Sequence, residues 1–172
     1  FGIMRFVNLA HGDLMVVAAF AVLVRVNALG LNVFISAIIA APIMFALGYW
    51  LQYAILNRTL GRDILPPLLV TFGLSIILQN GMLEIFSADS QRINAGALEA
   101  ASLNLGAGLA IGVMPLLTFI SAVAVIVVLN WLFYKTEVGR ALRATSDDPV
   151  TAQLMGIDNR SIFALAMGLS LT

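Results

Sequence analysis

Long apolar stretches separated by short polar ones run through the whole chain. A helix needs about 20 mostly apolar residues to cross the hydrocarbon core of a membrane. Four stretches reach or nearly reach this length, and a fifth begins near the end of the chain. They cover about residues 14–31, 33–56, 65–86 and 109–134, and the fifth starts near Ser161. This pattern predicts an all-α fold, a polytopic transmembrane helix bundle with four full spans and the start of a fifth.

The composition leads to the same class of protein. Apolar residues make up 61% of the 172 residues and charged residues 10%, whereas an ordinary soluble domain is about 45–50% apolar and about 25% charged. Such a chain cannot cover a water-facing surface, which excludes a soluble enzyme, a nucleic-acid binder and a disordered protein. The chain has no cysteine, so a disulfide-stabilised scaffold is excluded as well.

Both ends of the sequence suggest a fragment of a longer protein. The chain begins with Phe1 and stops at Thr172, within an apolar run. We therefore expect residues 1–172 to form part of a single transmembrane domain, and we expect the polar stretch 135–160 to be a loop within that domain.

Basic residues indicate the orientation in the membrane, because cytoplasmic loops are enriched in Lys and Arg. Segments 57–63 and 135–160 together carry six of these residues, whereas segment 87–108 carries one. The sequence therefore predicts that 57–63 and 135–160 lie on the cytoplasmic side and that 87–108 lies outside. Residues 1–12 then fall on or near the cytoplasmic side.

Bond-making chemistry has no recognisable signature in this sequence. It contains no His/Cys/Asp cluster spaced for a metal, no Gly-x-Ser-x-Gly motif and no paired histidines. Lys135 follows Tyr134, whereas the lysine of a Walker A loop follows glycine. We expect no enzyme activity, no metal and no cofactor, and we expect any ATP hydrolysis to occur on a separate subunit.

A stripe of polar residues marks the third span. Thr71, Ser75 and Gln79 recur every four residues and therefore share one helix face. Polar groups are expensive against lipid, so this face points into a bundle or a wet path. The residues either form hydrogen bonds between helices or line a substrate route, and they are candidates for a translocation path.

A second group of polar residues precedes the first span. Asn8, His11 and Asp13 surround Gly12 and have apolar sequence on both sides. One interpretation is a proton relay through His11 and Asp13. The other is a helix break whose polar side chains satisfy free backbone groups, with Asp13 capping the following span. Asn8 and His11 join the candidates for the translocation path.

The polar stretch 135–160 contains signals for a short helix. Helical spacing begins at Glu137, and Asp148 before Pro149 is a strong helix start. A helix over 149–155 would follow, with Gly156 as its natural end. Either Asp158 or Asn159 can cap the next span. This short helix is either a turn that lies on the membrane surface or a knob that docks into a cytosolic partner.

Three segments of the chain carry a resemblance to a known family. Residues 2–13 contain Asn-Leu-Ala-His-Gly, residues 69–80 contain the polar stripe, and residues 138–158 end in Leu-Met-Gly-Ile-Asp. In this order they resemble the inner-membrane permease subunits of bacterial branched-chain amino acid ABC importers. The resemblance covers essentially the whole chain. Asp13 stands where the family usually has glutamate.

The resemblance implies a multi-pass protein of the bacterial inner membrane that imports branched-chain or related amino acids. It implies cytosolic ATP-binding subunits, a second permease subunit and a periplasmic amino-acid-binding protein as partners, within a lipid bilayer. It also implies that 135–160 is the loop that couples to the ATPase, although Thr151 departs from the common pattern there. The implied coupling residues are Pro149, Thr151, Ala152, Gln153, Leu154, Met155 and Gly156.

Two other functions compete with the importer. An ATP-independent secondary transporter or channel for a small polar solute would need ionisable residues at mid-membrane depth, and only Glu84 and Arg25 come near, both close to span ends. A non-transporting scaffold would tolerate loss of the polar stripe. Relatives in the same superfamily carry urea or short amides, and nothing in these motifs excludes such substrates, so the substrate comes from the resemblance alone.

Overall fold

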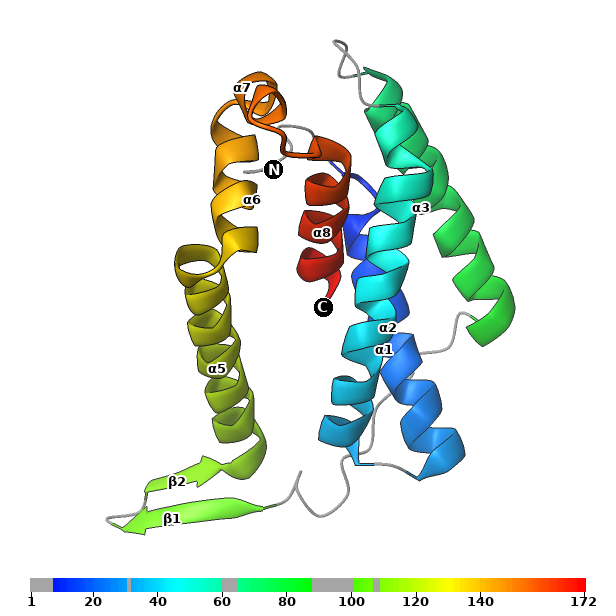
Figure 1. Cartoon of the computed structure of the whole chain (residues 1–172). Coiled ribbons are helices and arrows are strands. Elements are labelled where there is room, and N and C mark those ends of the chain that lie inside the picture. Colours follow the sequence, from blue (N-terminus) through cyan, green and yellow to red (C-terminus); the bar gives the residue numbers. More distant parts are fainter. Residues whose placement is uncertain (1–7, 31, 60–64, 88–100, 107–108) are drawn as a thin grey trace. The chain divides into compact units, whose positions relative to one another are not determined.

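The computed structural model describes residues 8–30, 32–59, 65–87, 101–106 and 109–172. These residues fall into two compact units, residues 1–91 with 141–172, and residues 92–140, and each unit is described by itself. The helices and strands are α1 (His11–Leu29), α2 (Val33–Ala54), the 3₁₀ turn η1 (Leu56–Arg58), α3 (Leu65–Phe86), β1 (Ser102–Gly106), β2 (Leu109–Gly112), α5 (Val113–Lys135), α6 (Glu137–Asp147), α7 (Pro149–Leu154) and α8 (Asn159–Leu171) (Figure 1).

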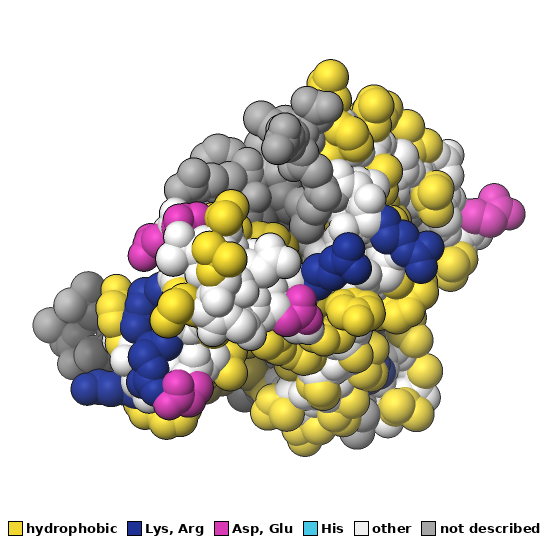
Figure 2. All heavy atoms as spheres, turned by 45° about the horizontal axis from the view of Figure 1, so that its top comes forward, with side chains coloured by type: hydrophobic (Ala, Val, Ile, Leu, Met, Phe, Trp, Pro, Cys, Tyr) yellow, Lys and Arg dark blue, Asp and Glu magenta, His cyan; other side chains and the backbone are white. Residues whose placement is uncertain are grey.

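Four of these helices are long and apolar enough to cross a membrane, namely α1, α2 with η1, α3 and α5. The predicted all-α transmembrane fold is therefore confirmed. The third span was predicted with the bounds that α3 has, whereas α1 begins three residues before the predicted first span. Near Ser161, where a fifth span was predicted to start, the chain forms the 13-residue helix α8. Figure 2 shows hydrophobic side chains over much of the visible face, as expected for surfaces that lipid or other helices cover.

The predicted start of the fourth span was wrong. Residues Leu109–Gly112 form β2, which pairs antiparallel with β1 in a register that places Ser102 opposite Gly112. The helix α5 begins only at Val113. Pro115 favours the later start, because proline lacks an N–H and costs least in the first turn of a helix. A helix begun at residue 109 would have placed this proline in its interior.

Glycine and asparagine between the first two apolar stretches predict a tight turn, and Gly30 and Asn32 bound the connection between α1 and α2. Gly30 ends α1 with a φ of 61°, a left-handed conformation that glycine adopts without strain. The side chain of Asn32 then caps α2 by accepting a hydrogen bond of 3.0 Å from the N–H of Phe34.

The junction of α5 and α6 depends on a glycine. The hydroxyl of Thr136 donates to the carbonyl of Leu132 at 2.6 Å and accepts from the N–H of Gly139 at 3.1 Å. A β-carbon on Gly139 would collide with the carbonyl oxygens of Leu132 and Phe133. Only glycine therefore permits the chain to turn this closely from α5 into α6.

The core of the first unit lies where α2 packs against α8. Gly48 and Gly168 let the two helices approach closely, since a β-carbon on Gly48 would lie 3.1 Å from the Cα of Gly168. Small residues at such crossings are typical of membrane helix packing. The buried cluster around the crossing contains Ala10, Leu14, Met44, Leu51, Met167 and Leu171.

Hydrogen bonds at one end of this crossing fix its direction. The buried Gln52 side-chain amide donates to Asn57 Oδ1 at 3.1 Å, and the Asn57 side-chain amide donates to the backbone carbonyl of Arg160 at 3.0 Å. The end of α2 thus meets the beginning of α8, and the two helices run antiparallel. Asn57 and Arg160 therefore lie at the same end of this unit, in agreement with the common side predicted for their segments from the charges.

The close approach of α2 and α8 makes Gly48 a test of this packing. We expect Gly48→Ala to lower the free energy of unfolding by about 1–3 kcal/mol, the usual cost of overpacking. The added methyl would lie 2.8 Å from Leu171 Cδ1 and 3.0 Å from the carbonyl oxygen of Met167. Thermal unfolding of the purified protein in detergent measures the change.

The matched control is Gly73→Ala in α3, where a β-carbon would meet nothing within 4 Å. This variant should be neutral or slightly stabilising, because alanine is the better helix former. Equal unfolding temperatures for the two alanine variants would contradict the glycine-mediated packing.

Candidate functional site

The short helix α7 is the first candidate site, and both of its ends are built as the sequence predicted. At its start the Asp148 carboxylate accepts hydrogen bonds from the N–H groups of Val150 at 3.0 Å and Thr151 at 3.3 Å. Pro149 occupies the first helical position, where its missing N–H costs nothing. Six residues would not form a stable helix alone, so these local bonds matter.

The end of α7 is a Schellman motif. Gly156 has a φ of 86°, and its N–H donates to the carbonyl of Gln153 at 3.0 Å, while the N–H of Ile157 donates to the carbonyl of Ala152 at 3.1 Å. The predicted termination at Gly156 is confirmed, although the helix ends at Leu154 and Met155 is its cap.

Asn159 holds α7 against the neighbouring helices. Its amide donates to the carbonyl of Pro149 at 2.7 Å, and its side-chain oxygen accepts a long hydrogen bond of 3.5 Å from the buried Thr145 hydroxyl of α6. Asp158, one of the two predicted caps, caps α8 by accepting from the N–H of Arg160 at 3.1 Å. The Ser161 hydroxyl donates to Asp158 and, together with this backbone bond, holds the pKa of the carboxyl below its usual value.

The α7 residues divide into an exposed and a buried set. Val150, Leu154 and Met155 are 69%, 82% and 80% exposed, and we call these three side chains the α7 knob. Ala152 is buried, at 4% exposure, so it packs inward and does not belong to the knob. Thr151, Gln153 and Gly156 are exposed, and Pro149 is half-buried. A rigid, capped turn that presents three apolar side chains is suited to docking.

The N-cap of α7 can be tested directly. We expect Asp148→Ala to lower the stability of α7 by about 0.5–2 kcal/mol, because the N–H groups of Val150 and Thr151 lose their acceptor. Hydrogen exchange of residues 149–156 should become faster, with little change in α2.

Asp148→Asn is the control for this experiment, since asparagine caps helices as well as aspartate does. It should exchange like the native protein. An alanine variant that also exchanges like the native protein would show that α7 does not depend on its cap.

The second candidate site joins α1 to the middle of α3. The Asp13 carboxylate accepts hydrogen bonds from the Ser75 hydroxyl and from the Gln79 amide, the latter at 3.1 Å. The same Gln79 amide also donates to Ser75 Oγ at 3.2 Å. We call Asp13, Ser75 and Gln79 the Asp13 cluster.

The Asp13 cluster fixes how α1 lies along α3. Asp13 is in the first turn of α1, whereas Ser75 and Gln79 are near the middle of α3. Seven residues further on, Phe20 stacks on Phe86 at the end of α3, with ring centroids 4.2 Å apart. The two helices therefore run parallel, and α1 begins beside the middle of α3. If α3 crosses the membrane, a carboxylate lies well within it.

The predicted role of Asp13 as a helix cap was wrong. Ala10 occupies the N-cap position of α1, and Asp13 turns toward α3 instead. It is Asn8 that satisfies a free backbone group, because its side chain accepts from the N–H of Ala10 at 3.1 Å. The other end of the Asn8 amide donates to the sulfur of Met167 at 3.5 Å, so Asn8 faces α8.

The predicted path residues do not form one group. Ser75 and Gln79 meet at the Asp13 cluster, as their shared helix face predicted. Thr71 is fully buried and donates to the carbonyl of Leu68 in its own helix at 3.0 Å. Asn8 faces α8, and His11 is the half-buried first residue of α1.

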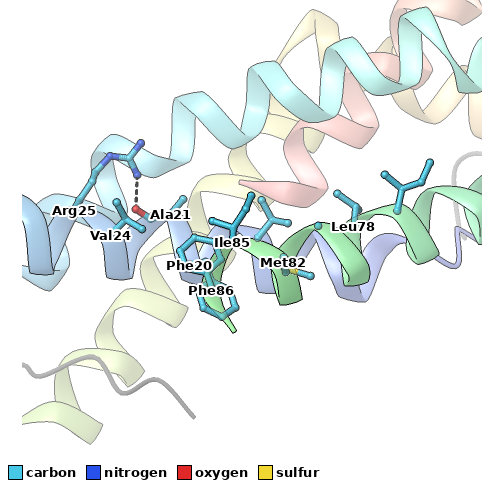
Figure 3. A pocket seen from close by; sticks show the side chains of 11 residues that line it. Phe20, Ala21, Val24, Arg25, Leu78, Met82, Ile85 and Phe86 are labelled. Atoms are coloured by element: carbon cyan, nitrogen blue, oxygen red, sulfur yellow. Dashed lines mark hydrogen bonds between the residues drawn. The ribbon is translucent and has the colours of Figure 1, made fainter. Parts of the chain in front are cut away.

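Two neighbouring cavities lie between α1 and α3. The smaller, about 420 Å³, is lined by Asp13, Val16, Phe20, Gln79, Met82, Leu83 and Ser87. The larger, about 590 Å³, is almost entirely apolar and has Arg25 at one end. Figure 3 shows the larger cavity, with the Phe20 and Phe86 rings stacked beside it and the Arg25 guanidinium bonded to the carbonyl of Ala21 at 2.9 Å. Phe20 and Met82 line both cavities.

Sequence reasoning missed Asp13 as a partner of the polar stripe. The first span was predicted to start at residue 14, which left Asp13 outside it. A signal was present, because a charge next to an apolar stretch needs a polar partner and the stripe of the third span supplies hydroxyl and amide groups. Among the described residues no group of three or more His, Cys, Asp or Glu side chains could hold a metal.

The fold and the two sites define a multi-pass membrane protein with a structured loop between two of its helices. Residues 1–170 match the family described as the permease component of the branched-chain amino acid transport system. The chain belongs to this family of non-catalytic membrane subunits.

One curated relative adds detail. The chain is 28% identical over 177 residues to the high-affinity branched-chain amino acid transport system permease protein BraD of Pseudomonas aeruginosa. The alignment covers 96% of this chain and 57% of the relative, so the chain spans a little over half the length of that protein. No solved structure matches the chain.

Proposed function

We propose that the chain is part of the permease of an ATP-driven importer that moves branched-chain or related amino acids into the cytoplasm. The permease acts in the bacterial inner membrane with a second permease subunit and two cytosolic ATP-binding subunits. A periplasmic amino-acid-binding protein delivers the substrate. Family membership and the likeness to BraD support this proposal.

The α7 knob is the observation that carries the ATP-driven mechanism. Its three apolar side chains extend from a loop that the charge pattern assigns to the cytoplasm. The bonds of Asn159 to Pro149 and Thr145 connect α7 to the start of α8 and to α6. A push on the knob would therefore move α8, and α8 packs on α2 through Gly48 and Gly168. This is a route by which ATPase closure reaches the membrane helices.

The translocation path, in this proposal, follows the α1–α3 face with Ser75 and Gln79. The proposed path extends along α3 to Thr71, four residues before Ser75, and along the chain to Asn8 and His11 at the start of α1.

The knob can be tested with Leu154, its most exposed member. We expect Leu154→Glu to reduce co-purification of the ATPase subunits and to lower ATP-dependent uptake at least tenfold. The glutamate would have to be desolvated in an apolar contact. Leu154→Met keeps an apolar side chain of similar size and should retain most of the uptake. Normal ATPase binding and uptake in the glutamate variant would contradict a docking role.

A crosslink tests the contact itself, and the absence of cysteine from this sequence helps. We expect a single cysteine in place of the exposed Gln153 of the full-length permease to crosslink to an ATPase subunit, with a yield that changes on ATP binding. A cysteine in place of the buried Ala152 is the control and should crosslink poorly. Equal yields at both positions, or no crosslink, would contradict docking by α7.

An ATP-independent secondary transporter or channel is the second candidate, and one observation favours it. Such transporters need an ionisable group at mid-membrane depth, and Asp13 lies beside the middle of α3. Amino acid uptake that persists without ATP and without α7 crosslinking would favour this candidate.

A further inference from the structure

We propose that the Asp13 carboxylate receives the ammonium group of the transported amino acid, whose aliphatic side chain occupies the adjoining 420 Å³ cavity. The inference rests on the proposed function, because it names a binding group within the same path. It adds a residue that the sequence resemblance and the comparisons do not assign.

The position of Asp13 calls for a role beyond packing. A carboxylate within a membrane span is costly unless it faces protein or water. Asp13 is only partly buried within its unit, and Gln79 beside it is exposed. Exposing this face to lipid would therefore cost much free energy. The face must border another protein surface or a wet path, and a translocation path between two permease chains supplies both.

Two hydrogen bonds orient the Asp13 carboxylate, and its oxygens can accept further hydrogen bonds. Ser75 donates to Oδ2 and Gln79 donates to Oδ1, so each oxygen already has one neutral donor. An ionised carboxylate offers about four acceptor positions. The two bonds fix the orientation of the carboxylate, and the remaining positions can accept from an ammonium group.

The cavity next to Asp13 has a polar end and apolar walls, which match the ammonium group and the apolar side chain of an aliphatic amino acid. One end carries Asp13, Gln79 and Ser87, whereas Val16, Phe20, Met82 and Leu83 form apolar walls. Among these lining residues Asp13 is the charged one, so the cavity selects for a cation at its polar end. Its volume of about 420 Å³ lies within the range of about 300–1,000 Å³ found for small-molecule sites.

The test compares leucine with its α-hydroxy acid analogue, which has the same side chain and carboxylate but no ammonium group. Binding is measured by saturation-transfer NMR on the full-length permease in lipid nanodiscs, without the periplasmic binding protein. We expect the native permease to bind leucine at least tenfold more tightly than the hydroxy acid. In Asp13→Asn leucine binding should fall to the level of the hydroxy acid, whose own binding should change little.

Two controls separate a binding role from a structural one. Asp13→Asn keeps a side-chain oxygen that can accept from Ser75 or Gln79, and thermal unfolding shows whether it folds as the native protein does. Glu84→Gln removes a carboxylate of α3 that is not among the residues lining the cavity. This variant should keep the native preference for leucine over the hydroxy acid.

Any of three results would overturn the inference. Native discrimination that survives in Asp13→Asn would show that the carboxylate does not recognise the ammonium group, and so would an equal loss of both ligands. Failure of the native permease to bind leucine would overturn it as well. ATP-dependent uptake by the assembled importer decides the proposed function separately, because it does not require a measurable resting-state site.

Discussion

The absence of water from the hydrocarbon core of a membrane is the constraint on which this structure depends. Every backbone polar group inside a span must find its partner within the protein, and polar side chains there are costly without one. Thr71 meets this demand within its own helix, and Gln52 and Asn57 bond to each other and to the backbone of Arg160. Asp13 meets this demand by accepting hydrogen bonds from Ser75 and Gln79 of another helix, α3. The polar groups thus connect the helices, while apolar burial alone would not set their register.

Close backbone contact is the second interaction that holds the helices together. Lipid is as apolar as leucine, so burying apolar side chains contributes little to helix association in a membrane, and packing must supply it. Gly48 and Gly168 bring α2 and α8 together, and the buried cluster fills the space around them. This packing aligns the start of α8 with the end of α2, and α7 sits directly before α8. The packing of α8 on α2 and the proposed docking by α7 are therefore linked along one stretch of chain.

The two candidate sites differ in how much of them the sequence predicted. The caps of α7, its Pro149 start and its glycine end depend on residues within a few positions of one another, so a local pattern suffices. The shared face of Ser75 and Gln79 followed from helical spacing. The partner of that face did not, because Asp13 is 62 residues from Ser75 in the sequence. The burial of Ala152 within an otherwise exposed turn also needed the neighbouring helices.

The sequence by itself determined the membrane-spanning class, three of the four spans to within a few residues, the turn at Gly30 and Asn32, and the capped helix at 149–154. Each of these follows from hydrophobic period, charge or capping chemistry that acts over a few residues. Only the tertiary structure decided that Asp13 faces α3 and that α1 begins beside the middle of α3. It also decided that two glycines let α2 and α8 pack closely. Those features arise from helices distant in sequence, whose relative register is chosen by packing and by the need to pair polar groups away from water.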